Sequence, residues 1–174
     1  MAEVVLFIAA SLDGLIARSN GAVDWLFTDQ DYGYRDFFAS IDTVIMGRKT
    51  YTQILQWGDY PYQGKQGFVF TRSPSPTQDD NVEFVQENIE ALMASLRSRT
   101  GQNIWLVGGA ELIALFRQQQ WIDQLILSIH PLILETGIPL FLPVVGQVQQ
   151  LIFQQMQVFE TGLIQTTYSF SSES

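Results

Sequence analysis

The sequence contains no cysteine and only one histidine, His130. The absence of cysteine excludes disulfides, thiolate metal ligands and cysteine nucleophiles, and one histidine cannot form a histidine-clustered metal site. We therefore expect no bound metal. A Ser-His-Asp triad would need His130, but no G-x-S-x-G segment accompanies it. Its apolar neighbours in "LILSIHPLIL" favour a structural role for this imidazole.

Positive charge is also scarce, since 9 Lys and Arg residues face 18 Asp and Glu residues and the net charge is −9. Nucleic acid is a poor partner for such a chain, because phosphate binding needs a basic face. The longest apolar runs, such as residues 4–10, are far too short to span a membrane, and no basic region typical of a secretory signal precedes them. We expect a cytoplasmic protein that binds neither nucleic acid nor membranes.

Apolar residues make up 47% of the 174 residues, which predicts a single domain over residues 1–174 with a substantial core. Segments typical of strands and of helices alternate in the first two thirds of the chain. We predict strands at 4–10, 43–47, 67–71, 82–85 and 103–107, and helices at 29–40, from residue 49 or 50, at 88–99 and at 109–119.

The last third of the chain changes character. Strand-like segments at 125–134, 151–160 and 163–170 follow one another without an obvious helix, and Thr161-Gly162 separates the last two as a hairpin turn would. Together with the alternating first part, this pattern predicts an α/β fold with a mostly parallel sheet and an antiparallel edge. The Gly- and Asn-containing loop 11–25 is long for a connection, which suggests a functional role.

Two predicted strands end in glycine turns that lead into helices. Gly47-Arg48-Lys49-Thr50 follows the strand at 43–47, and Gly108-Gly109-Ala110-Glu111 follows the strand at 103–107. Turns of this kind share the carboxyl edge of a parallel sheet, where glycine lets a ligand approach the backbone and helix N-termini attract anions. Arg72 directly follows a third strand, so three of the nine cations are expected at this edge. The sequence predicts a site for a phosphorylated small molecule there.

Simpler explanations exist for each turn. Tight packing of a helix on the sheet accounts for many Gly-Gly pairs, and Arg48 and Lys49 could be two solvated side chains on an exposed turn. The dinucleotide fingerprint G-x-G-x-x-G is absent, so an ordinary Rossmann site is not indicated.

The segments "FIAASLDGLIAR", "VDWL", "DTVIMGRKTY", "VFTR" and "IWLVGGAELI" occur in an order and spacing that resemble the dihydrofolate reductase superfamily. The chain is most similar to the branch with the reductase domain of bacterial riboflavin biosynthesis, the RibD C-terminal domain, and its small stand-alone relatives. The resemblance covers essentially the whole chain. It implies a dihydrofolate reductase-like three-layer α/β/α fold, with about eight strands in a mixed, mostly parallel sheet, and NADPH as hydride donor.

The resemblance also implies roles for individual residues. The turn after the strand at 43–47 would contact the adenosine-phosphate and pyrophosphate side of NADPH. The end of the strand at 67–71 would contact its 2′-phosphate. The turn after the strand at 103–107 would contact its pyrophosphate and nicotinamide. In chain order these cofactor-binding residues are Ala10 and Ile16 beside the nicotinamide ring, Gly47, Arg48, Lys49, Thr50, Arg72, Ser73, Gly108, Gly109, Ala110, Glu111 and Leu112.

At the substrate end, the resemblance implies that Trp25, Asp29 and Asp31 bind the substrate and that Asp31 is the catalytic acid. The residues also allow another interpretation: Thr28 and Asp31 have the spacing of a helix N-terminus, where Asp31 would only cap the helix. The expected reaction reduces a C=N or C=O bond of a pyrimidine- or pterin-like molecule, as in a 5-amino-6-(5-phosphoribosylamino)uracil reductase. Arg18 and Lys65 are the cations nearest in sequence that could bind the phosphate of such a substrate.

Other functions stay open. The chain could be an NADPH-binding sensor or dimerising module without turnover, a genuine dihydrofolate reductase, or a purely structural interaction domain. We also expect a homodimer, because apolar segments such as 125–134 offer faces that one layer of helices would not cover, and because the family branch often forms dimers.

Overall fold

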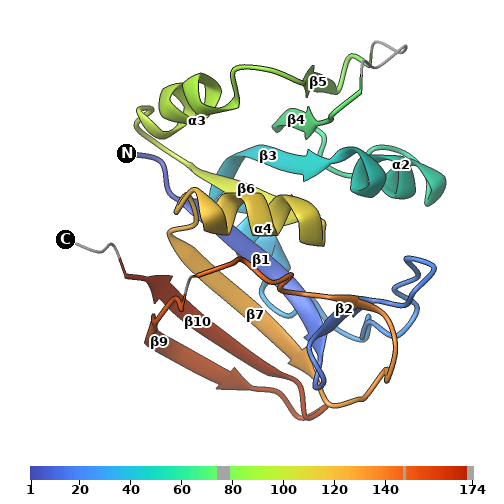
Figure 1. The fold of residues 1–174 in the computed structure, drawn as a ribbon. Helices are drawn as coiled ribbons and strands as arrows, with labels where there is room; N and C mark the ends of the chain where they lie inside the picture. The colour runs from blue at the N-terminus through green and yellow to red at the C-terminus, as the bar shows by residue number, and fades with distance from the viewer. Residues whose placement is uncertain (74–78, 147, 172–174) are drawn as a thin grey trace.

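The computed structural model describes residues 1–73, 79–146 and 148–171, which form a large sheet flanked by helices (Figure 1). The strands of the large sheet are β1 (Val4–Ser11), β3 (Ile41–Gly47), β4 (Gln66–Phe70), β5 (Val82–Val85), β6 (Asn103–Gly108), β7 (Gln124–His130), β9 (Leu151–Val158) and β10 (Ile164–Phe170). A small separate sheet pairs β2 (Leu15–Ala17) with β8 (Ile138–Pro139). The helices in the described ranges are α1 (Tyr34–Ala39), α2 (Arg48–Gln56), α3 (Ile89–Arg97) and α4 (Ala110–Gln118).

The eight strands of the large sheet lie in the order β5-β4-β3-β6-β1-β7-β10-β9. Neighbours from β5 to β7 run parallel, whereas β10 is antiparallel to β7 and β9 is antiparallel to β10. The predicted mostly parallel sheet with a C-terminal antiparallel hairpin is therefore confirmed. Three neighbouring strands, β4, β3 and β6, are followed by the segments that the sequence predicted to bind phosphate.

One face of the sheet packs against α1 and α2. Successive side chains of a strand point to opposite faces, and on this face Val44 and Trp105 lie in a buried cluster with Phe37 of α1 and Ile54 of α2. The aromatic rings of this cluster meet mostly edge to face. Phe37 and Trp105, for example, lie 5.3 Å apart between ring centroids at 88°.

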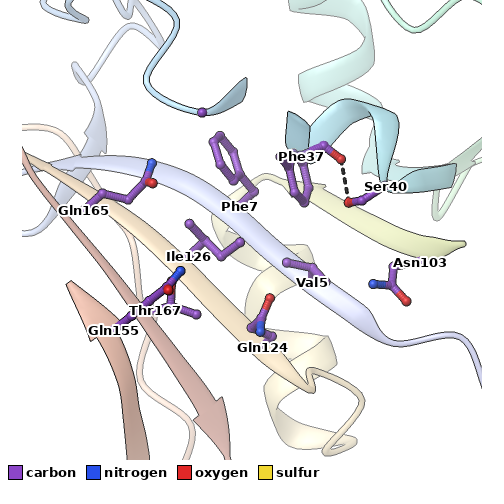
Figure 2. Close-up of a pocket in the computed structure, with 11 residues that line it drawn as sticks. Val5, Phe7, Phe37, Ser40, Asn103, Gln124, Ile126, Gln155, Gln165 and Thr167 are labelled. Atoms are coloured by element: carbon purple, nitrogen blue, oxygen red, sulfur yellow. Dashed lines mark hydrogen bonds between the residues drawn. The ribbon is translucent and has the colours of Figure 1, made fainter. Parts of the chain in front are cut away.

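A cavity of about 230 Å³ lies on the same face beside α1 (Figure 2). Its lining among the described residues carries no charge and combines Phe7 and Phe37 with the amides of Gln124, Gln155 and Gln165. Since Gln124 is the first residue of β7, the cavity extends toward the amino ends of the strands. It is therefore separate from the carboxyl edge that carries the glycine turns.

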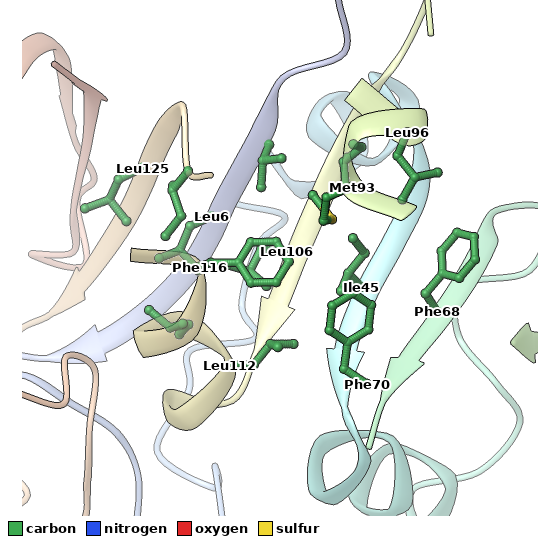
Figure 3. Packing of buried hydrophobic residues seen from close by; sticks show 14 of the residues in the cluster. Leu6, Ile45, Phe68, Phe70, Met93, Leu96, Leu106, Leu112, Phe116 and Leu125 are labelled. Atoms are coloured by element: carbon green, nitrogen blue, oxygen red, sulfur yellow. The ribbon is translucent and has the colours of Figure 1, made fainter. Parts of the chain in front are cut away.

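The opposite face packs against α3 and α4, which completes three layers (Figure 3). Leu6 and Leu106 from the strands meet Met93 and Leu96 from α3 and Phe116 from α4, and each of these side chains is at most 1% exposed. Burying a side chain of this size stabilises the fold by about 1.5–3 kcal/mol before entropy is counted. The apolar stripe predicted on the helix at 88–99 is thus the stripe that faces the sheet.

The first helix is shorter than the sequence predicted. The predicted helix at 29–40 is wrong, because α1 begins only at Tyr34 and ends at Ala39. Tyr32 and Gly33 have φ angles of 51° and 80°, left-handed values that a right-handed helix cannot contain. Thr28 therefore does not cap this helix. α3 and α4 begin and end within two residues of their predicted bounds, and α2 begins within two residues of its predicted start.

The predicted loop 11–25 contains the short strand β2, which the sequence analysis missed. Three residues are too few to show a periodic pattern, and the partner strand β8 lies far along the chain. Gly137, immediately before β8, approaches β2 so closely that a Cβ atom there would overlap the carbonyl oxygen of Ala17. This pairing anchors the loop to the segment that follows β7.

The outer strand β9 exposes apolar side chains at the edge of the sheet. Ile152, Phe153, Met156 and Val158 are 52–62% exposed. The register with β10 places Phe153, Met156 and Val158 on one face. By contrast, β7 lies inside the sheet between β1 and β10. Most of this strand belongs to the segment 125–134, which was expected to present an uncovered apolar face.

Candidate functional site

The carboxyl ends of β4, β3 and β6 lie next to one another in the sheet. Arg72 and Ser73 follow β4, Gly47–Thr50 follow β3 and open α2, and Gly108–Leu112 follow β6 and open α4. The structure thus brings together at one edge three segments that are far apart in the sequence. This is the edge at which ligands bind in open α/β sheets.

The two glycine turns are in direct contact. A Cβ atom on Gly47 would lie 3.8 Å from the carbonyl oxygen of Gly108 and 3.9 Å from the nitrogen of Gly109. A Cβ atom on Gly109 would lie 3.3 Å from Oγ1 of Thr50. Gly108 has a φ angle of +119°, which residues other than glycine rarely adopt.

Both turns lead into helix N-termini that can receive an anion. Gly47 and Gly109 are the N-cap residues of α2 and α4, and neither cap makes a side-chain hydrogen bond within the described residues. The first backbone N–H groups of each helix are therefore not satisfied by a cap side chain, and the helix dipole adds partial positive charge. Bare backbone, helix N-termini without a capping side chain and nearby cations fit the phosphates of a nucleotide.

A carboxylate lies between the cations of this edge. Glu111 Oε1 is 3.4 Å from Lys49 Nζ, and Glu111 Oε2 is 3.3 Å from Arg72 Nη2. The side chains of Lys49 and Arg72 are 94% and 90% exposed, and that of Glu111 is 57% exposed. Exposed ion pairs contribute about 0–1 kcal/mol to stability. The cluster therefore adds little to stability, and its charges are exposed to solvent.

Some predicted cofactor residues can offer only their backbone. The side chains of Ala10 and Leu112 are 2% and 7% exposed and belong to the core cluster under α3 and α4. Ile16 on β2 is half-buried against the same cluster. Ser73 is held in a tight turn, since its N–H donates to Thr71 Oγ1 at 3.2 Å and Thr71 Oγ1 donates to the Ser73 carbonyl at 2.9 Å.

The loop between β1 and residue 25 is tied down at several points. Arg18 forms a two-pronged ion pair with Asp24, at 2.6 and 3.1 Å. The Gln53 amide of α2 donates to the Gly21 carbonyl, which fastens the loop beside the first glycine turn. The Asp13 carboxylate accepts backbone N–H groups from the segment after β7, at 3.1 and 2.9 Å. The loop is therefore an ordered boundary of the site.

Trp25 and His130 lie at the carboxyl ends of β1 and β7. His130 closes β7, pairs in register with Ser11 and is 3% exposed. Its Nε2 accepts the Phe27 N–H at 3.2 Å, so the ring proton is on Nδ1, which faces the Ser128 carbonyl at 3.4 Å. Burial lowers the pKa of His130, although hydrogen bonds to backbone carbonyls oppose the shift. His130 is thus a neutral residue that holds the 25–27 segment.

The indole of Trp25 has an unused donor. Its ring stands edge-on to His130, with 5.1 Å between the ring centroids, and is 7% exposed. The buried Nε1–H has no hydrogen-bond partner among the described residues. A buried N–H without a partner is costly, so this donor points to an acceptor that a ligand or water supplies.

The two predicted acids are held differently. Tyr32 Oη donates to Asp29 Oδ1 at 2.7 Å and lies 3.1 Å from Thr161 Oγ1 in the β9–β10 turn. The hydrogen bond from the Tyr32 hydroxyl is the main reason why the pKa of Asp29 is lowered. Both carboxylate oxygens of the exposed Asp31 accept the backbone N–H of Arg35, at 3.2 Å each. Asp31 thus caps the first turn of α1, although the helix begins later than predicted.

The model of the RibD C-terminal domain family matches residues 2–164. The chain belongs to this family. Among relatives, it is 45% identical over 143 residues to the uncharacterized protein YwjB of Bacillus subtilis (strain 168), covering 80% of this chain and 82% of YwjB. It is also 33% identical to the uncharacterized protein YyaP of the same organism, covering 97% of this chain and 95% of YyaP.

Solved structures show the same fold. A Shewanella sp. PV-4 protein named for riboflavin biosynthesis superimposes with a TM-score of 0.86 at 28% identity, covering 99% of this chain and 100% of that chain. A Thermotoga maritima deaminase/5-amino-6-(5-phosphoribosylamino)uracil reductase superimposes with a TM-score of 0.74 at 16% identity, covering 98% of this chain and 57% of that chain. The predicted dihydrofolate reductase-like α/β fold and the RibD resemblance are therefore confirmed.

Three features of this candidate site escaped the sequence analysis. The ion pairs of Glu111 and the bond between Tyr32 and Thr161 join residues that no local pattern connects. His130 was expected to be structural, but its hydrogen bond to Phe27 was not foreseen. The spare cations considered for a substrate phosphate are engaged elsewhere: Arg18 pairs with Asp24, and Lys65 Nζ donates to the Ile41 carbonyl at 2.7 Å.

Proposed function

We propose that this RibD C-terminal domain protein is an NADPH-dependent reductase that reduces a C=N or C=O bond of a small pyrimidine- or pterin-like molecule. The observation that carries the proposal is the convergence at the ends of β4, β3 and β6. Two glycine turns touch there, and Lys49 and Arg72 lie on either side of Glu111 at this edge. The family supports it, since the Thermotoga maritima relative is named as a uracil-derivative reductase.

In this proposal each segment of the edge holds one part of the coenzyme. Gly47, Arg48, Lys49 and Thr50 hold the adenosine-phosphate side, and Arg72 with Ser73 holds the 2′-phosphate. The backbone of the segment 108–112 holds the pyrophosphate and nicotinamide end, with Ala10 and Ile16 beside the ring. When bound, the coenzyme supplies a hydride from the nicotinamide C4.

The substrate would lie beside β1 and β7, because β1 adjoins β6 in the sheet and Trp25 occupies that side. The Trp25 Nε1–H, which has no partner within residues 1–73, 79–146 and 148–171, would donate to a carbonyl oxygen or ring nitrogen of the substrate. Arg18 and Lys65 already have partners, so this end favours an uncharged heterocycle over a phosphorylated one. Hydride addition to carbon requires a proton on the neighbouring heteroatom, and Asp31 or water would supply it.

Binding can be tested by titrating the fluorescence of the four tryptophans with NADPH and NADH. We expect quenching by NADPH below about 100 µM, within the usual range of coenzyme affinities. Arg72→Gln should weaken the binding of NADPH more than the binding of NADH. If neither coenzyme changes the fluorescence at these concentrations, the proposal is wrong.

A binding module without turnover is the second candidate, and the geometry of Asp31 favours it. A carboxylate that accepts the Arg35 N–H acts as a helix cap, a role that requires no chemistry. Asp31→Asn separates the two functions, because asparagine can still cap the helix but cannot supply a proton. Full retention of reductase activity by this variant would remove Asp31 from the mechanism. NADPH binding without oxidation by any heterocycle or quinone would favour the module.

We also propose that the protein forms a homodimer through β9. This edge strand carries no charged residue in a chain of net charge −9, so no charged side chains of the strand oppose each other when two copies meet there. Its exposed apolar side chains and unpaired backbone edge are features that monomeric proteins usually suppress. Sedimentation at the monomer mass of 19.7 kDa at all concentrations would refute the dimer.

A further inference from the structure

Glu111 is an anion placed inside the proposed anion-binding edge. It belongs to the first turn of α4, directly after Gly108-Gly109. One of its carboxylate oxygens contacts Lys49 from the β3–α2 turn and the other contacts Arg72 after β4. A single carboxylate therefore spans the cations of two neighbouring strand ends, as an oxyanion of a ligand would.

We propose that Glu111 determines coenzyme specificity by competing with the 2′-phosphate for Lys49 and Arg72. This inference rests on the proposed binding of a nicotinamide coenzyme. It assigns to Glu111 an effect opposite to that of a simple phosphate-binding residue. The two cations attract the phosphate of NADPH, and the carboxylate between them reduces that attraction.

The charges at the edge explain the direction of the effect. A 2′-phosphate that contacts Lys49 or Arg72 must break the ion pairs of Glu111 or lie beside its negative charge. The 2′-hydroxyl of NADH carries no charge and can donate a hydrogen bond to the carboxylate. Glu111 therefore weakens NADPH binding and does not weaken NADH binding. The protein's preference for NADPH over NADH is then smaller than Lys49 and Arg72 alone would produce.

The size of the effect follows from the exposure of the cluster. Each exposed ion pair contributes little, and two such pairs correspond to an affinity change of about two- to thirtyfold. Glu111→Gln keeps the shape of the side chain and removes its charge. We expect this variant to bind NADPH more tightly by a factor in that range and to bind NADH no more tightly than the wild type does.

The experiment measures dissociation constants by calorimetry for NADPH, NADH, adenosine 2′,5′-bisphosphate and adenosine 5′-monophosphate. The last two probes differ in the 2′-phosphate and contain no nicotinamide. Glu90→Gln is the matched control, because Glu90 also lies in the first turn of a helix, α3, and the substitution changes the net charge equally. Arg72→Gln is measured in the wild-type and Glu111→Gln backgrounds to obtain the coupling between the two residues.

The outcomes separate this inference from the proposed function. If Glu111→Gln increases affinity for both 2′-phosphorylated probes and Glu90→Gln does not, Glu111 is the specificity determinant. Arg72→Gln should then cost more NADPH affinity in the Glu111→Gln background than in the wild type. If the wild type binds nucleotides but Glu111→Gln behaves like Glu90→Gln, the inference is wrong and the proposed function stands. If no variant binds any of the four probes, both fail.

Discussion

Mild acid should destabilise this protein through one residue, His130. The chain has a single histidine and no cysteine, so His130 is the one side chain whose ordinary pKa lies between about 5 and 8. In the folded protein its ring is buried between Trp25 and Phe27, and Nε2 accepts the Phe27 N–H. A protonated ring would place a buried charge there and turn this acceptor into a second donor.

The direction of the pH effect follows from proton linkage. Burial lowers the pKa of His130 in the folded state below its ordinary value of 6.5, so the unfolded chain binds this proton first as the pH falls. The free energy of unfolding is therefore constant above pH 6.5 with respect to this group, and it decreases below that value until the folded-state pKa is reached. The slope for one group is at most about 1.4 kcal/mol per pH unit.

Urea unfolding between about pH 7.5 and 5.5 measures this slope. His130→Gln is the informative variant, because its amide oxygen can accept the Phe27 N–H while the side chain does not titrate in this range. We expect the variant to lose the pH dependence above pH 5.5, whatever its overall stability. Tryptophan fluorescence, which includes Trp25, should report the release of the 25–27 segment in the wild type.

An equal slope in the wild type and in His130→Gln would refute the reasoning. The carboxylates provide a check on the interpretation. Asp24 and Asp29 have lowered pKa values, through hydrogen bonds from Arg18 and Tyr32 respectively, so their stabilising contributions are lost as the pH falls through and below the ordinary value of 3.8. Their effect falls outside the window assigned to His130.

Three further predictions concern backbone positions and the sheet edge. Gly47→Ala should change the unfolding free energy by less than about 1 kcal/mol, because φ is −78° and the new Cβ meets ordinary contacts. The same variant should bind NADPH about tenfold more weakly in calorimetry, because the new methyl group occupies space through which the ligand approaches the backbone. Gly67→Ala should cost about 1–3 kcal/mol in urea unfolding, since its Cβ would lie 2.7 Å from Tyr60 Oη and 2.9 Å from the Asn81 carbonyl oxygen; a stability like the wild type would contradict this packing. Met156→Lys should convert a dimer to monomers in sedimentation without loss of stability, because the side chain is 57% exposed.

The site divides into a part that the sequence predicted and a part that it could not. The glycine turns were predictable because each is a short local motif that follows an apolar strand, and Arg72 was predictable for the same reason. The contact between Gly47 and the Gly108-Gly109 peptide, however, depends on β3 and β6 being neighbours in the sheet. Strand order results from the packing of the whole domain, so the sequence suggested a shared edge without demonstrating contact.

The substrate side shows the opposite balance. Its contacts join distant segments: Phe27 to His130, Tyr32 to Thr161, and Gln165 to the Tyr32 carbonyl. These bonds coincide with the left-handed conformations of Tyr32 and Gly33 that delay the start of α1. The helix predicted from local spacing extended through Tyr32 and Gly33, because sequence periodicity contains no information about tertiary contacts. The competing explanation for Asp31, a cap on α1, matches the observed hydrogen bonds.

Apolar periodicity and glycine position, which are local properties, were enough to establish the class of fold, most element bounds and the segments at the carboxyl ends of β4, β3 and β6. The exclusion of thiol and histidine-cluster chemistry needed composition alone. The partners of Glu111, the neutral state of His130, the buried indole N–H of Trp25 and the exposed edge of β9 depend on how distant strands come together. Burial and charge pairing are properties of neighbours in space, and for this protein those neighbours are mostly remote along the chain.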